Sequence, residues 1–63
     1  PEVPVTFLEL PVIGKPVRIL HNGKEGYTAV VVMIQSHQTQ TNRFRITTQA
    51  GVACEGPLSP IAA

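Results

Sequence analysis

Arg43 and Arg45 are the residues whose types and spacing best suit a chemical task. They lie two positions apart in the alternating segment 43–49, so their side chains share the polar face of a predicted strand. A guanidinium group binds phosphates and carboxylates through paired hydrogen bonds. With Arg18 or Lys24, the two arginines would form a small basic patch for RNA or DNA. The alternative is a solvated arginine pair with no binding role.

The rest of the sequence gives this basic patch little support. Barrels that bind nucleic acids commonly combine such a patch with stacking aromatic rings. Tyr27 and Phe44 are the candidates, and the alternation places Phe44 on the core face of its strand. The chain has five Lys and Arg against four Asp and Glu, a net charge of +1. A typical nucleic-acid-binding domain is much more basic, so nucleic-acid binding is the second hypothesis.

Cys54 and His21 are the candidates for nucleophilic chemistry. A single cysteine excludes a disulfide within the chain and is too little for a zinc site. His21 could approach Cys54 across strands, but no third group is identified that would orient the pair. We therefore expect a buried, inert thiol, with no catalytic residues, no metal and no cofactor. An enzyme whose site is shared between subunits is the third hypothesis.

The elements that position these residues are short strands. The chain has 63 residues, enough for one domain, and its six prolines and five glycines interrupt any long helix. Strands are predicted over residues 17–21, 27–35, 43–49 and 52–55, with residues 36–42 as a polar loop. Asn22-Gly23 predicts a tight turn, with Gly26 at a bulge. Residues 1–13 are expected to form an extended N-terminal arm or edge strand, and residues 14–63 a small β-barrel domain.

The order of these elements resembles that of SH3-like barrels. Over residues 14–61 it runs from a Gly-x-x-Val-Arg strand and a glycine-containing loop to a long bent strand and a polar loop. An alternating strand, a tight turn, a short strand and a proline-containing turn follow. The resemblance implies an all-β fold of about five short antiparallel strands. An Sm-like barrel is the second choice. It ranks below the SH3-like barrel because an Sm fold usually begins with a helix, and the proline-rich start of this sequence predicts none.

The strand at residues 27–35 is apolar on both faces, which predicts an interface. One face serves the core, and strict alternation places a second set on the outside: Tyr27, Ala29, Val31 and Met33. The alternative is a bent strand that serves two parts of one core. Charged residues make up 14% of the chain, below the roughly 25% of ordinary domains. A surface so poor in charge suits contact with a partner.

These observations favour a non-catalytic β-barrel interaction module over the other two hypotheses. We expect it to form a homo-oligomer or to bind another protein. The first residues do not have the pattern expected of a signal peptide, and the longest apolar run is far shorter than the roughly 20 residues of a membrane helix. A cytoplasmic location, in which the free thiol would stay reduced, is therefore expected.

Overall fold

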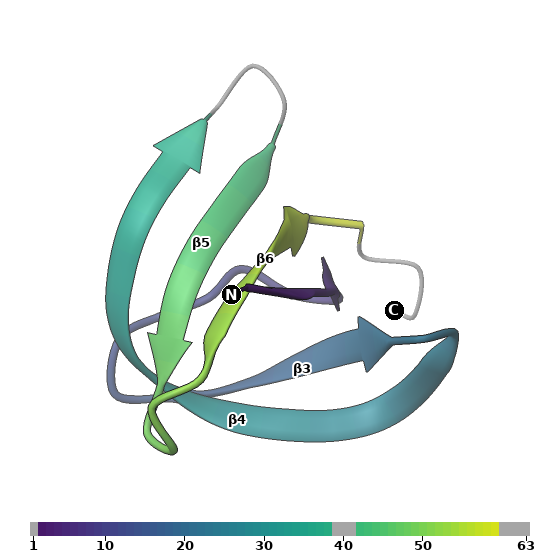
Figure 1. Cartoon of the computed structure of the whole chain (residues 1–63), viewed down its shortest axis with the longest axis horizontal. Helices are drawn as coiled ribbons and strands as arrows, with labels where there is room; N and C mark the ends of the chain where they lie inside the picture. The colour runs from purple at the N-terminus through teal and green to yellow at the C-terminus, as the bar shows by residue number, and fades with distance from the viewer. Residues whose placement is uncertain (1, 39–41, 60–63) are drawn as a thin grey trace.

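The chain is all-β over the residues that the computed structural model describes, 2–38 and 42–59 (Figure 1). Within them it forms six strands and no helix. The strands are β1 (Val3–Pro4), β2 (Thr6–Phe7), β3 (Pro16–His21), β4 (Lys24–Gln38), β5 (Arg43–Thr48) and β6 (Ala53–Pro57). The predicted all-β class is confirmed. No helix in the described part of the chain has the length and apolar character needed to cross a membrane.

The strands form one curled sheet, a half-barrel with the order β1-β6-β5-β4-β3-β2. Most neighbours are antiparallel, but β1 pairs with β6 in parallel. The sheet therefore differs from the predicted five antiparallel strands in number and in direction. The reason is that the N-terminal segment adds two short strands of its own, one of them parallel to its neighbour.

β4 is the long bent strand that holds the two halves of the sheet together. It has 15 residues and changes partner along its length, pairing with β3 up to Val30 and with β5 from Val31 onward. Figure 1 shows the strand sweeping from the β3 side of the molecule to the β5 side. β4 runs to Gln38, so the predicted loop at 36–42 begins later than expected. Residues 39–41 lie outside the described part of the chain.

The turn at Asn22-Gly23 confirms the strongest local signal in the sequence. Both residues have positive φ, 54° and 73°, as a two-residue hairpin turn requires. His21 and Lys24 pair directly across it. The register shifts between His21 and Ile19, so β4 carries an extra residue where the bulge was predicted.

The core confirms the predicted alternation of β5. Phe44, Ile46 and Thr48 are buried there, at 3%, 0% and 5% exposure. The ring of Phe44 meets that of Phe7 edge to face, with centroids 6.0 Å apart. The same core takes side chains from both predicted segments, 1–13 and 14–63.

Val31 lies in this core, so its predicted place on the outer face of β4 is wrong. Its side chain is fully buried, whereas Tyr27 and Met33 are 50% and 53% exposed and Ala29 is partly buried. The cause is the register shift between Val31 and Met33, which breaks the strict alternation. Val32, at 46% exposure, consequently faces solvent beside Met33.

The N-terminal segment joins the two edges of the curled sheet. β1 and β2 are separated by Val5 alone, yet β1 pairs with β6 and β2 pairs with β3. The Val5 amide donates to the Glu55 carbonyl at 2.9 Å, and the Leu8 amide donates to the Arg18 carbonyl at 3.0 Å. Val5, Phe7 and Leu8 are buried. The segment therefore supplies both backbone partners and core side chains.

Gly56 is the residue of β6 over which this segment passes. A Cβ atom built on Gly56 would lie 1.6 Å from the carbonyl oxygen of Val5. A separation that small is a severe overlap, because atoms in contact lie about 3.5–4.0 Å apart. Only glycine therefore allows the N-terminal segment to lie against β6.

Gly56→Ala should destabilise the protein by at least about 3 kcal/mol, because the segment or the β6 backbone must move away. Gly51→Ala is the matched control. Gly51 has φ of 80° with open space around it, so its cost is limited to backbone strain of about 1–2 kcal/mol. Urea unfolding of both variants measures the difference. Equal losses of stability would contradict this role of Gly56.

Candidate functional site

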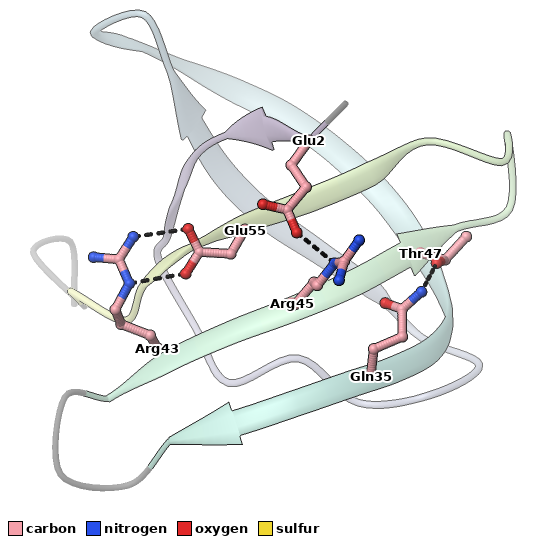
Figure 2. A network of polar contacts seen from close by, with 6 residues as sticks. All are labelled: Glu2, Gln35, Arg43, Arg45, Thr47 and Glu55. Carbon is pink, nitrogen blue, oxygen red and sulfur yellow. Dashed lines mark hydrogen bonds and ion pairs between the residues drawn. The ribbon is translucent and has the colours of Figure 1, made fainter.

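Arg43 and Arg45 lie on the solvent-facing side of β5, as predicted, but both are ion-paired (Figure 2). Arg43 donates two hydrogen bonds to the Glu55 carboxylate, each of 2.8 Å. Arg45 pairs with Glu2, which precedes β1. Figure 2 shows these side chains as a row across β5, β6 and the N-terminal segment. The predicted basic patch is therefore a network of alternating charges.

The other two predicted basic residues do not join this row. Arg18 lies on β3, which β4 separates from β5 in the sheet. Its side chain pairs with Glu9 at 3.7 Å, and the same carboxylate accepts the backbone N–H of Arg18 at 2.7 Å. Lys24 is exposed beside the Asn22-Gly23 turn and belongs to none of the three ion pairs of the described side chains. Of the four predicted basic residues, the fold therefore brings together only Arg43 and Arg45.

The paired hydrogen bonds from Arg43 lower the pKa of Glu55. Partial burial opposes the shift, whereas the positive charges of Arg43 and Arg45 add to it. Glu55 in turn raises the pKa of Arg43. A phosphate group that approached Arg43 would have to displace a carboxylate already bound through two hydrogen bonds.

Cys54 is buried, as predicted, and burial raises the pKa of its thiol. A nucleophilic cysteine must be a thiolate, so this environment does not suit catalysis. The ring of His21 lies edge to face against Tyr27, with centroids 6.2 Å apart. Among the described residues, no group of three or more His, Cys, Asp or Glu side chains is placed to hold a metal ion.

The other candidate feature of the surface is apolar. We call it the junction surface, because it surrounds the point where the β2–β3 connection meets β4. The turn before β3 is tied to Val31 by two backbone bonds: the Gly14 amide donates to Val31 at 2.7 Å, and the Val31 amide donates to Lys15 at 3.1 Å. The exposed large apolar residues of this turn and the adjoining part of β4 are Leu10, Val12, Ile13, Val32 and Met33.

Of these five residues, only Met33 was predicted to lie at an interface. Leu10, Val12 and Ile13, at 58%, 46% and 59% exposure, come from a stretch that the prolines keep out of a regular strand. These three large apolar residues, in a stretch without a regular strand, were the sequence signal that could have predicted this surface. Val32 gave no signal, because its exposure depends on the register shift next to Val31.

A shallow hollow lies between β4 and the end of β5. It has a volume of about 270 Å³ and is lined by Thr28, Ala29, Val30, Thr48, Gln49 and Ala50. The Gln49 amide donates to the Val30 carbonyl at 2.8 Å, which closes the end of the gap between β4 and β5. Ligand pockets are commonly about 300–1,000 Å³, so this hollow lies just below that range.

Comparison of the chain with protein-family models, curated proteins and solved structures finds no match.

Lowering the pH should reduce the free energy of unfolding, because Glu55 becomes protonated. Because the pKa of Glu55 is lower in the folded state, its contribution to stability is present above the ordinary glutamate pKa and is lost as the pH falls through the folded value. Glu55→Gln should therefore be less stable than wild type at pH 7, and the difference should shrink in acid. Thermal unfolding across a pH series measures this.

Arg43→Gln is the control for that pH dependence. Without the guanidinium hydrogen bonds, the Glu55 pKa returns toward its usual range and the loss of stability in acid becomes smaller. If wild type and Arg43→Gln lost stability in parallel as the pH fell, the ion pair would not be the cause.

Proposed function

We propose that this protein is a non-catalytic interaction module that makes protein–protein contacts, in the first place with further copies of itself. The observation that carries the proposal is the junction surface. Its five large apolar side chains are each at least 46% exposed and come from two adjoining segments. Large apolar side chains exposed on adjoining segments are a common mark of an interface.

The energetics of burial support this proposal. Full burial of a large apolar side chain contributes roughly 1.5–3 kcal/mol relative to its exposed state. Association costs a comparable total in lost freedom of motion, so several such side chains must be covered together. The junction surface offers five within one region. A domain of 63 residues also gains stability from a partner, because by itself it buries only about 60% of the surface that its unfolded chain exposes.

The charges favour a protein partner over RNA or DNA. All three arginines are paired with carboxylates, two of them in the network across β5 and β6. Phosphate binding depends on cations that are free to replace counterions. Retention on immobilised heparin at two salt concentrations separates the hypotheses: salt-sensitive retention supports nucleic acid, and no retention supports a protein partner.

The SH3-like assignment belongs to this proposal as well. Its support is the order of the elements, from the glycine-containing turn before β3 to the long bent β4, the alternating β5 and the short β6. Barrels of this size commonly act by binding, although fold alone does not define a function.

Met33→Lys should weaken self-association about tenfold, since it places a charge within the junction surface. Tyr27→Lys is the matched control. Tyr27 lies on the same strand with nearly the same exposure, 50% against 53%, but on the half of β4 that pairs with β3. Sedimentation velocity over a concentration series measures both. A wild-type protein that stays monomeric throughout, or equal effects of the two variants, would contradict the proposal.

A further inference from the structure

We infer that the first half of β4 has an open edge, formed by the backbone of Thr28 and Val30, which binds an extended peptide of another protein as an added strand. The peptide would lie beside β4 in the place that β5 leaves free beyond its last residue. This open edge is separate from the junction surface. The inference therefore goes beyond the proposed function and does not depend on self-association.

The backbone of Thr28 faces away from β3. Thr28 lies opposite Arg18 in the β3–β4 ladder. Both backbone groups of Arg18 are bonded on the β2 side of β3: its carbonyl accepts the Leu8 amide at 3.0 Å, and its N–H donates to the Glu9 carboxylate at 2.7 Å. Opposite residues of an antiparallel pair exchange either both of their backbone bonds or none. The N–H and C=O of Thr28 therefore point to the other edge of β4.

The bonds of the neighbouring residues give the same direction. Val31 bonds on the β3 side, to the turn that precedes β3. The Val30 carbonyl accepts the amide of Gln49, the residue after β5, at 2.8 Å. Successive residues of a strand direct their backbone groups to opposite edges. Thr28 and Val30 therefore share the edge that faces the β5 side.

This edge has unpaired backbone groups. β5 pairs with β4 only from Val31 onward, so β4 continues past the end of β5 with β3 alone as its partner (Figure 1). Gln49 bonds to the Val30 carbonyl and to no further group of β4. The Val30 N–H and both backbone groups of Thr28 have no partner within residues 2–38 and 42–59. Three backbone groups in a row are therefore available to a partner.

The hollow between β4 and the end of β5 lies along this open edge. Its lining joins residues 28–30 of β4 to residues 48–50 at the end of β5. Thr28 is exposed, and Ala29 and Val30 are partly buried. The hollow therefore places space, about 270 Å³, directly beside the three unpaired groups.

The unpaired groups define the chemistry of the partner. Donors and acceptors that follow one another along a strand edge match the spacing of an extended backbone, and strand addition is a common mode of peptide recognition. Edges that are protected against such partners commonly carry charged side chains, prolines or bulges. Residues 27–30 have none of these: they read Tyr-Thr-Ala-Val, and their register with β3 is regular. An extended peptide is therefore the partner that fits this edge.

The test titrates a short capped peptide of alternating threonine and valine, with a lysine at each end for solubility, into the wild-type protein. NMR follows the backbone amides. Those of Thr28 and Val30 should shift and exchange with solvent several-fold more slowly, because each gains a hydrogen bond. The Ala29 amide faces β3 and is the internal reference. A titration that leaves the amides of Thr28 and Val30 unchanged would overturn the inference.

Thr28→Pro tests the edge from the side of the protein. It removes the outward N–H and leaves the bonds to β3 in place, and proline is tolerated where the N–H of an edge strand faces solvent. Peptide binding should weaken about tenfold. Thr28→Val is the matched control, because it changes the side chain and keeps the N–H, and it should bind as wild type does. Equal losses in the two variants would contradict strand addition.

Ala50→Trp tests the hollow without changing β4. Ala50 is exposed in the β5–β6 connection, so the indole ring can fill the hollow at little cost to folding. Peptide binding should weaken several-fold. Val52→Trp is the control, since Val52 is exposed in the same connection but does not line the hollow. An equal effect of the two tryptophans would count against the site.

Met33→Lys separates this inference from the proposed function. It should weaken self-association and leave peptide binding unchanged, because Met33 lies in the junction surface and not on the open edge. A wild-type protein that stays monomeric but binds the peptide would refute the proposed self-association alone. If Thr28→Pro abolished dimers and the peptide did not bind, the edge would pair two copies, and the inference of a peptide partner would be wrong.

Discussion

The close approach of Val5 to Gly56 is the contact on which the rest of this small sheet depends. Because Gly56 has no side chain, the N-terminal segment can lie against β6 and reach β3 within a few residues. Three of the nine buried apolar residues in the described chain, Val5, Phe7 and Leu8, belong to this segment. Without it, β3 and β6 would expose backbone edges and the core would lose a large part of its volume.

The same segment determines what remains on the surface. Glu2 pairs with Arg45, and Glu55, whose carbonyl accepts the Val5 amide, pairs with Arg43. The arginines that suggested phosphate binding thereby stabilise the join between β5, β6 and the N-terminal segment. The continuation of the segment leaves apolar side chains exposed beside β4. Closure of the sheet thus pairs the arginines with carboxylates and leaves large apolar side chains exposed.

Local patterns in the sequence predicted the elements, and long-range contacts determined the site. The alternation around Phe44 and the Asn22-Gly23 turn are local signals, and the structure confirms both. The parallel pairing of β1 with β6 joins residues some fifty positions apart and leaves no periodic signal. The burial of Val31 depends on a register shift between two strands, which one strand's sequence does not encode. The carboxylate partner of each arginine likewise lies on a different segment.

The measurement that tests this account most directly is native-state hydrogen exchange of the Val5 and Leu8 amides. Both bond to backbone carbonyls of neighbouring strands, and the Thr48 amide, bonded to Val52 at 2.9 Å, serves as the reference within the sheet. If the N-terminal segment is an integral part of the fold, all three amides should exchange only through global unfolding, with the same free energy of opening. Exchange of Val5 and Leu8 at a much lower free energy than Thr48 would show a segment that detaches from an intact sheet. That result would contradict the account.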